Sequence, residues 1–274
     1  MTAPPGYARV AVGGADALAW EPAAEWLEDL LARGERLHGW ARAARVAERD
    51  GGRAAVPVVR APARGPDGRE RWAVRHYARG GAARALGDLY ARLGSARPWR
   101  ELGASHEARA RGVPTPAVVA GAAYPAGPFY RADLATELVP GARSLYAILL
   151  ADGNARGASR WHEPDRGAEL ELAPEPVAAE VALRLAGRLV RRLEEARVLH
   201  RDLNAHNVLI AGGEAGPEAW VVDLDRCAVL SGAAPAAGRM RERLRRSLRK
   251  LGAARGRPFS AAEWEALRSG FEEP

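Results

Sequence analysis

Lysine, cysteine and long uncharged segments are scarce in this sequence of 274 residues. The single cysteine, Cys227, excludes an internal disulfide and any metal site built from several cysteines, and it suits a reducing compartment. The first residues contain no basic segment followed by an apolar core, and prolines interrupt the longest uncharged stretch, residues 114–130. We therefore expect a cytoplasmic protein without a signal peptide or a membrane-spanning helix, whose contact with a membrane is peripheral.

Arginine supplies almost all of the positive charge, because Lys250 is the only lysine. The formal net charge is +7, which indicates an acidic partner such as nucleic acid, anionic lipid or a phosphorylated small molecule. No nucleic-acid-binding motif and no interleaved aromatic platform accompanies this charge, so we expect no nucleic-acid partner.

The spacing of apolar residues predicts strands first and helices later. We expect a short accessory helix over residues 25–31, two strands joined by a hairpin loop within 51–77, a helical region up to Leu93, and a helix over 97–112 that ends at Gly112-Val113-Pro114. We expect extended chain from there to about residue 137, and we expect an exposed insertion over residues 153–174. Strands are expected at 207–210 and 219–225, before a basic helical C-terminal part.

A long helix is predicted over residues 176–196. Its apolar residues recur at a four-residue step, which predicts a buried face made of Val177, Val181, Leu185, Leu189 and Leu193. This helix leads directly into the strongest motif of the sequence.

That motif lies in "VLHRDLNAHNVLI", residues 198–210. His200-Arg201-Asp202 and Asn207 form the pattern H-R-D-x-x-x-x-N, which is typical of the catalytic loop of kinase-like phosphotransferases. An Asp in this position accepts the proton of an attacking hydroxyl, and an amide oxygen five residues later binds Mg²⁺. We therefore predict Asp202 as the catalytic base and Asn207 as a metal ligand.

A second metal ligand is predicted in "WVVDLD", where Asp223 follows the apolar residues Trp220 to Val222. Protein kinases carry D-F-G at this place. Here Asp225 replaces the glycine, and on a continuing strand it would share a face with Asp223, so the two carboxylates could share the metal. Oxygen ligands of this kind suit Mg²⁺.

The same scheme needs a cation on a strand and a carboxylate on a helix to hold the phosphates of ATP. "WAVRHY" places Ala73 and Arg75 on one strand face, with the small residue over the nucleotide base and the cation toward its phosphates, while His76 points to the other face. Arginine binds phosphate bidentately and keeps its charge. Glu101 in "RPWREL" is the matching carboxylate. Gly51-Gly52 is the best candidate for a phosphate-covering loop, although it is shorter than G-x-G-x-x-G.

Each of these residues also has an ordinary structural explanation, as a turn former or as solvated surface. The order along the chain favours the functional interpretation: the cationic strand, the helix with its carboxylate, the H-R-D-x-x-x-x-N loop and the strand ending in Asp follow one another as a kinase requires.

In these motifs the sequence resembles the 3-deoxy-D-manno-octulosonic acid (Kdo) kinases, which belong to the lipopolysaccharide-core kinases of the protein-kinase-like superfamily. The matching stretches run in order from Trp72 to Phe271: "VRHYARGG", "RPWREL", "GVPTP", "YRADLATELVPGARSL", "LHRDLNAHNVLI", "VVDLDR", "RLRRSLRKL" and "WEALRSGF". The resemblance implies a two-lobed α+β protein-kinase-like fold. Residues 1–139 would form the nucleotide-binding N-lobe with an N-terminal helical extension, and residues 140–274 a helical C-lobe with the catalytic loop, the metal ligands and the acceptor site.

The resemblance also implies a phosphotransferase with an alcohol acceptor that uses ATP and Mg²⁺. Its γ-phosphoryl group would pass to a hydroxyl of the Kdo sugar on Kdo-lipid A precursor, an anionic glycolipid, at the cytoplasmic face of the inner membrane. Residues 238–251 fit such a partner, because Met240, Leu244, Leu248 and Leu251 form one apolar stripe and the arginines lie elsewhere. A packed helix with a solvated arginine face explains the same pattern equally well.

Other acceptors and a non-catalytic role stay open at this point. Protein kinases usually have lysine where Asn204 stands, and no A-P-E segment follows Asp223, which disfavours a Ser/Thr acceptor. Heptose or aminoglycoside kinases are alternatives, although aminoglycoside kinases more often have His-x-Asp without the Asn-Ala-His context. The absent strand lysine is typical of pseudokinases, whereas the complete set of Asp202, Asn207 and Asp223 argues against one.

Overall fold

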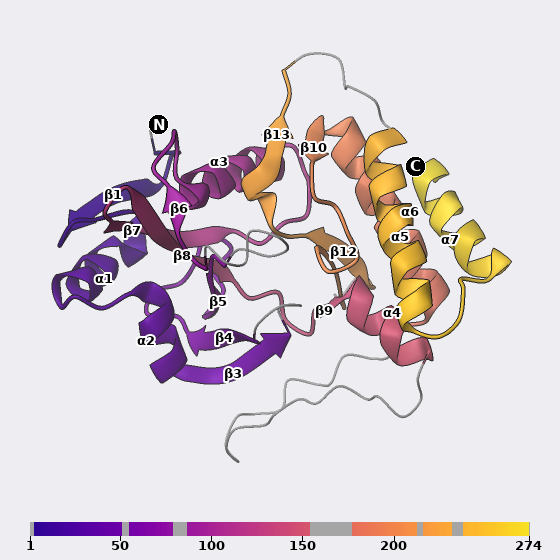
Figure 1. The fold of residues 1–274 in the computed structure, drawn as a ribbon, viewed down its shortest axis with the longest axis horizontal. Helices are drawn as coiled ribbons and strands as arrows, with labels where there is room; N and C mark the ends of the chain where they lie inside the picture. The colour runs from indigo at the N-terminus through magenta and orange to yellow at the C-terminus, as the bar shows by residue number, and fades with distance from the viewer. Residues whose placement is uncertain are drawn as a thin grey trace. The chain divides into compact units, whose positions relative to one another are not determined.

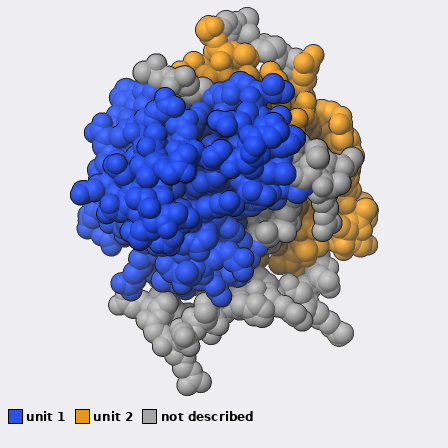
Figure 2. All heavy atoms as spheres, turned by 60° about the vertical axis from the view of Figure 1, so that its left-hand side comes forward, with its two compact units in different colours: residues 1–106, 117–138, 162–166 blue, residues 107–116, 139–161, 167–274 orange. Residues whose placement is uncertain are grey.

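The computed structural model describes residues 3–50, 55–78, 87–153, 177–212, 216–231 and 238–273. These residues form two compact units (Figure 2). Unit 1 contains the described residues within 1–106 and 117–138, and unit 2 those within 107–116 and 139–274. The expected α+β class is confirmed, with an antiparallel sheet in the N-terminal part and mainly helices in the C-terminal part.

Unit 1 is built on one antiparallel sheet with the strand order β1-β2-β7-β8-β5-β4-β3, and β6 pairs with β8 (Figure 1). The strands are β1 (Tyr7–Val12), β2 (Ala15–Trp20), β3 (Arg45–Asp50), β4 (Ala55–Arg60), β5 (Arg71–His76), β6 (Tyr90–Ala91), β7 (Val118–Ala126) and β8 (Phe129–Glu137). The predicted hairpin within 51–77 is the antiparallel pair β4–β5, in which Val58 lies opposite Ala73. The β1–β2 hairpin was not predicted; its turn, Gly13-Gly14, has positive φ at both residues, as a tight hairpin turn requires.

Helices pack on both faces of this sheet. On one face, α1 (Glu21–Ala32) and α2 (Leu37–Ala43) bury Leu27 and Leu37 against Trp72 and Val74 of β5. On the other, α3 (Arg97–Ala110) packs Leu102 into a cluster with Tyr77 and Leu134. The helix expected over 25–31 therefore exists but is part of the core, which corrects its assignment as an accessory.

The helical region expected up to Leu93 is wrong over its described part. Residues 87–93 contain a turn at Gly87, where φ is +58°, and the short strand β6. The paired glycines Gly51 and Gly52 and nearly all of the predicted insertion at 153–174 lie outside the described residues.

Unit 2 contains two small sheets, with strand orders β12-β11-β9 and β10-β13, among helices. Its elements are β9 (Arg143–Ser144), α4 (Leu145–Gly153), α5 (Ala179–Glu195), β10 (Val198–His200), β11 (Val208–Ala211), β12 (Glu218–Val221), the 3-10 helix η2 (Leu224–Arg226), β13 (Cys227–Val229), α6 (Gly238–Ala254) and α7 (Ala261–Glu272).

The buried face of α5 matches the predicted one only in part. Leu189 and Leu193 are buried as predicted, whereas Val181 is 42% exposed, and Leu183 and Val190, which were not predicted, are buried. A strict four-residue step rotates around a helix of 3.6 residues per turn, so the predicted stripe drifts away from the core. The face that packs against α7 is set instead by small residues: a Cβ on Gly187 would lie 2.5 Å from the carbonyl oxygen of Leu267.

Candidate active site

The catalytic-loop motif lies between β10 and β11, and His200 anchors its start. The imidazole is fully buried; its Nε2 lies 3.1 Å from the carbonyl oxygen of Val222, and its Nδ1 lies 3.2 Å from the backbone nitrogen of Asp202. Burial lowers the pKa of His200, so the ring is neutral and can donate through Nε2 while accepting at Nδ1. His200 therefore orients the start of the loop.

Asn204 and Asn207 converge on the backbone of Asp202. The side-chain amide of each donates a hydrogen bond of 2.9 Å to the carbonyl oxygen of Asp202. Asn204 also accepts the N–H of His206 at 2.9 Å, a pair of bonds that needs a donor and an acceptor on one short side chain. A lysine has no acceptor, so the residue that distinguishes this loop from that of protein kinases also has a local structural reason.

The hydrogen bond from Asn207 determines what its amide can do. With Nδ2 committed to Asp202, Oδ1 is the oxygen left to contact a cation. The Asp202 side chain is half-buried and reachable from solvent. The roles of Asp202 as base and of Asn207 as metal ligand stay predictions.

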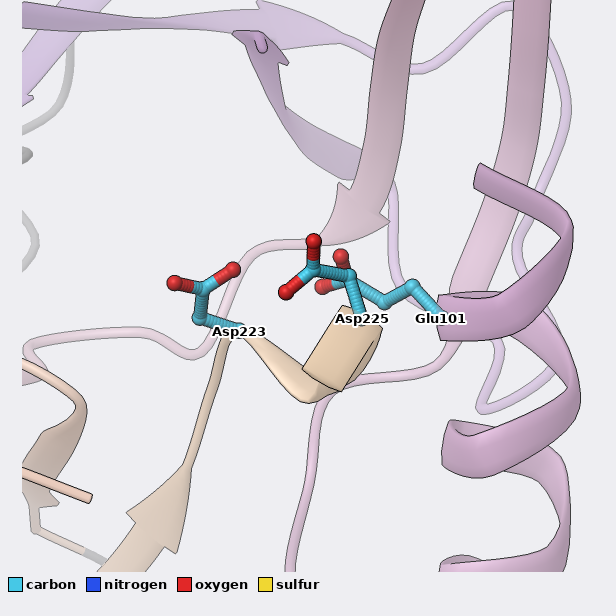
Figure 3. A group of neighbouring side chains, drawn as sticks. All are labelled: Glu101, Asp223 and Asp225. Carbon is cyan, nitrogen blue, oxygen red and sulfur yellow. The ribbon is translucent and has the colours of Figure 1, made fainter. Parts of the chain in front are cut away.

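Asp223 and Asp225 follow β12, but not on a continuing strand. The strand ends at Val221, Asp223 has φ +66° and ψ +56° in the left-handed region, and Asp225 lies in η2 (Figure 3). The expectation of a common strand face is therefore wrong, because the left-handed residue turns the chain and ends the alternation of side chains. The turn still brings carboxylate oxygens of the two residues within 4.8 Å of each other. A left-handed Asp is a strained conformation of the kind found at functional sites.

Side chains of helix α6 form hydrogen bonds to the backbone of the catalytic loop. Met240 Sδ accepts the N–H of His200 at 3.3 Å, Ser247 Oγ accepts the N–H of Ala205 at 3.1 Å, and Arg243 donates to the carbonyl oxygen of Arg201. The sequence indicated the apolar stripe of this helix but not these polar contacts, since nothing in the spacing shows which segment the helix meets.

In unit 1, the structure brings the predicted cation and carboxylate together. Arg75 on β5 forms an ion pair with Glu101, which projects from α3 (Figure 3) and has a side chain only 5% exposed. Tyr77 was not predicted here: its hydroxyl donates to Glu101 at 2.5 Å, and the Arg75 guanidinium lies 4.6 Å from the centre of its ring. Ala73 lies on β5 two residues before Arg75, opposite Val58 and Thr136.

His76 lies on the opposite face of β5, as alternation predicts. Its ring nitrogens lie 2.6 Å from Asp133 and 3.1 Å from Asp88, and the hydrogen bond to Asp133 raises the pKa of His76. Asp133 is fully buried and also accepts the backbone N–H of His38 at 3.0 Å. This network ties α2 to the sheet and so has a structural role.

No described helix combines the length and the apolar character needed to cross a bilayer.

Comparison with known proteins gives a consistent result. The model of the lipopolysaccharide kinase (Kdo/WaaP) family matches residues 39–271. A 3-deoxy-D-manno-octulosonic acid kinase of Photobacterium profundum is 32% identical over 205 residues, covering 74% of this chain and 75% of the relative. One from Vibrio cholerae is 32% identical over 200 residues, covering 72% and 73%. A solved structure of WaaP in complex with acyl carrier protein aligns with a TM-score of 0.47 at 18% identity, over 90% of this chain and 86% of that one. This chain belongs to the lipopolysaccharide kinase (Kdo/WaaP) family.

Proposed function

We propose that this protein transfers the γ-phosphoryl group of ATP to a hydroxyl of the Kdo sugar on Kdo-lipid A precursor. Membership of a kinase family makes it a phosphotransferase that uses ATP. The observation that carries the finer proposal is the catalytic loop, in which two asparagine side chains hold the backbone of Asp202. The 32% identity to Kdo kinases supports Kdo as the acceptor.

In this proposal Asp202 positions the acceptor hydroxyl and takes its proton. As the oxygen of that hydroxyl bonds to the γ-phosphorus, the bond from phosphorus to the β–γ bridging oxygen breaks and ADP leaves. Asn204, Asn207 and buried His200 hold the backbone of Asp202, which limits the positions that its carboxylate can take. Such positioning lowers the activation barrier, because less entropy is lost when the reacting groups meet.

Unit 1 supplies the nucleotide side of the proposal. Arg75, oriented by Glu101 and Tyr77, would contact the phosphates, and Ala73 on the same strand face would leave room for the base. Gly51 and Gly52 remain our candidates for the phosphate-covering loop. The division of labour between a nucleotide-binding lobe, residues 1–139, and a catalytic and acceptor-binding lobe, residues 140–274, belongs to the same proposal.

The donor set of unit 2 fits Mg²⁺. The free oxygen of the Asn207 amide and the carboxylate of Asp223 are hard oxygen donors, and Asp225 adds a carboxylate within 4.8 Å of Asp223. When bound, the ion would neutralise charge on the phosphates. Asp225 as a third ligand is part of this proposal.

Contact with the cytoplasmic face of the inner membrane would depend on attraction between exposed basic side chains and anionic lipid. The apolar stripe of α6 is packed inside unit 2, with Leu244 and Leu248 fully buried, while Arg246 and Lys250 are exposed. The structure thus favours the packed-helix interpretation of the stripe, and the exposed basic residues are what an anionic glycolipid would meet.

An acceptor screen by mass spectrometry tests the proposal. Purified protein with Mg-ATP is offered Kdo-lipid A precursor, a heptose-bearing core glycolipid, a generic protein substrate and an aminoglycoside, and we expect one added phosphate on the Kdo glycolipid. Asp202→Asn should lower turnover by about 10²-fold or more, whereas Asp16→Asn, an exposed carboxylate on β2, should not.

A mass gain only on protein or on aminoglycoside would refute the Kdo acceptor. Full activity of Asp202→Asn would refute the assignment of the base. Binding of ATP without phosphoryl transfer to any of the four acceptors would favour a pseudokinase.

A further inference from the structure

A concave site lies in unit 2, at the C-terminal part of α6 and the first half of α7. It is a cavity of about 800 Å³, within the size range of small-ligand sites. Four arginines and two aromatic residues contribute to its lining: Arg245, Arg249, Arg257, Arg268, Phe259 and Trp264. Nothing in the proposed phosphoryl transfer uses this cavity.

The arginines differ in how firmly carboxylates hold them. Arg245 is half-buried and stacks on Phe271, with 5.3 Å from its guanidinium carbon to the ring centre, and within the described residues it makes no ion pair. Arg249 pairs with Glu242 at 3.0 Å, but both side chains are largely exposed, so that pair is weak and readily exchanged. Arg268 pairs with two glutamates, Glu265 and Glu272, and so contributes less positive charge to the cavity.

A buried ion-pair network lies beside the cavity. Glu263 accepts hydrogen bonds from Arg255 at 2.7 Å and from Arg257 at 2.9 Å, and both Glu263 and Arg255 are almost completely buried. Burial opposes the charge of Glu263, but the bonds from the Ser260 backbone, Arg257 and Arg255 outweigh it and lower the pKa to about 2. One carboxylate thus faces two guanidinium groups, and this part of the lining stays positive.

The aromatic residues give the cavity an apolar wall. The rings of Phe259 and Trp264 lie 5.4 Å apart at 54°, and Arg255 covers the Phe259 ring at 3.8 Å from its centre. A ligand that suits this lining has an anionic group with several oxygens, which arginine forks recognise, next to an apolar part.

We propose that this cavity binds a phosphate monoester carried on an apolar stem, with Arg245 and Arg249 donating to the phosphate and Phe259 and Trp264 packing against the stem. The site is distinct from the catalytic loop although the same helix serves both: Arg243 and Ser247 of α6 contact the loop, whereas Arg245 and Arg249 line the cavity. The proposal therefore does not depend on the acceptor that the kinase uses.

Isothermal titration calorimetry on the whole protein tests the site with dihexanoyl phosphatidic acid as the phosphate monoester and inorganic phosphate as the group alone. We expect the lipid analogue to bind more tightly than phosphate. The double variant R245Q/R249Q should lose about tenfold or more in affinity, because charge-assisted hydrogen bonds are removed. The matched control R184Q/R192Q removes two exposed charges of α5, in the same unit but outside the lining, and its affinity should stay within about threefold.

Equal losses in the two double variants would overturn the site, because the effect would then be general surface charge. Equal affinity for phosphate and for the lipid analogue would overturn the role of the apolar wall, which Trp264→Leu checks separately: it should weaken the analogue and leave inorganic phosphate unchanged. Thermal melting of each variant shows that it is folded, and the single variant R245Q keeps the test valid if the double variant unfolds.

Vesicles identify the source of the ligand. Phosphatidylcholine vesicles with and without phosphatidic acid are sedimented with the wild-type protein and with both double variants. Loss of co-sedimentation in R245Q/R249Q alone supports a membrane lipid. Equal co-sedimentation of all three proteins, together with the calorimetric difference, supports a soluble phosphorylated ligand of the same chemistry.

Discussion

The Arg75–Glu101 pair predicts effects on stability and on ATP use that can be separated. The Glu101 side chain is 5% exposed and accepts from both Arg75 and the Tyr77 hydroxyl. Removing one partner of a buried pair costs about 3–5 kcal/mol, since a buried charge loses its compensation. Because the Arg75 side chain is 29% exposed and Tyr77 remains, we expect Arg75→Met to lower the free energy of unfolding by about 2–3 kcal/mol.

A double variant isolates the cause of that loss. In R75M/E101M no buried charge is left, and apolar side chains of similar length occupy both positions, so most of the lost stability should return. Urea denaturation measures this directly. With a slope of about 2 kcal/mol per M, R75M should lower the midpoint by about 1 M, and the double variant should recover most of that shift.

Activity should behave differently. If Arg75 contacts the phosphates of ATP, both R75M and R75M/E101M should lower kcat/KM for ATP by about 10²-fold, the loss of two or more charge-assisted hydrogen bonds. Arg75→Lys keeps the positive charge but loses the two parallel donors of the guanidinium group, so its kcat/KM for ATP should lie between those of the wild type and R75M. Recovery of both stability and kcat/KM in the double variant would refute the phosphate role and leave Arg75 a structural residue. Unchanged stability of R75M would refute the dependence of Glu101 on it.

Three further predictions concern unit 2. Gly270→Ala places a Cβ 2.1 Å from the carbonyl oxygen of Arg184 and should lower the free energy of unfolding by about 1–3 kcal/mol. The control Gly39→Ala, in α2 of unit 1 with open space around it, should raise the free energy of unfolding by up to about 1 kcal/mol. Urea denaturation measures both, and a gain in stability at Gly270 would contradict the close contact between α5 and α7. Asn204→Lys removes two hydrogen bonds of the catalytic loop and should lower kcat at least about tenfold with little change in melting temperature; full activity would show that the loop holds its shape without them. The pKa of Glu263 falls from 4.5 to about 2 in the folded protein, so its contribution to stability is present above pH 4.5 and is lost as the pH falls toward 2; Glu263→Gln should flatten the melting temperature across that window, and an unchanged acid profile would refute the assignment.

Local patterns predicted the parts of the site that are close in sequence. Asp202 and Asn207 share one loop, and the hydrogen bonds that link them and their neighbours His200, Asn204 and His206 lie within residues 200–207. The alternation along β5 placed Arg75 and His76 on opposite faces, and the helix signals placed Glu101 on α3. These features depend on neighbours a few residues away, and a single sequence contains that information.

Pairings between segments that are far apart in the sequence could not be predicted from local patterns. The sheet of unit 1 joins β2 to β7, about a hundred residues later, and nothing in either strand specifies the other. The contribution of Tyr77 to Glu101 depends on the packing of α3 against β5, and the turn at Asp223 depends on a left-handed conformation that propensity disfavours for residues other than glycine. Strained and long-range features are therefore where the sequence interpretation failed.

Helix α6 shows why composition alone left the role of the basic C-terminal segment open. Its pattern fits a membrane-surface helix and a packed helix equally, because both need one apolar stripe and one basic face. In the structure the stripe is buried and three residues, Met240, Arg243 and Ser247, contact the catalytic loop, so inserting the apolar face into a bilayer would pull apart the support of that loop. An anionic surface can then attract this helix only through its exposed cations. Such attraction is screened over a Debye length of about 10 Å at 0.1 M salt, so it has to weaken as salt is added while the fold of unit 2 stays intact.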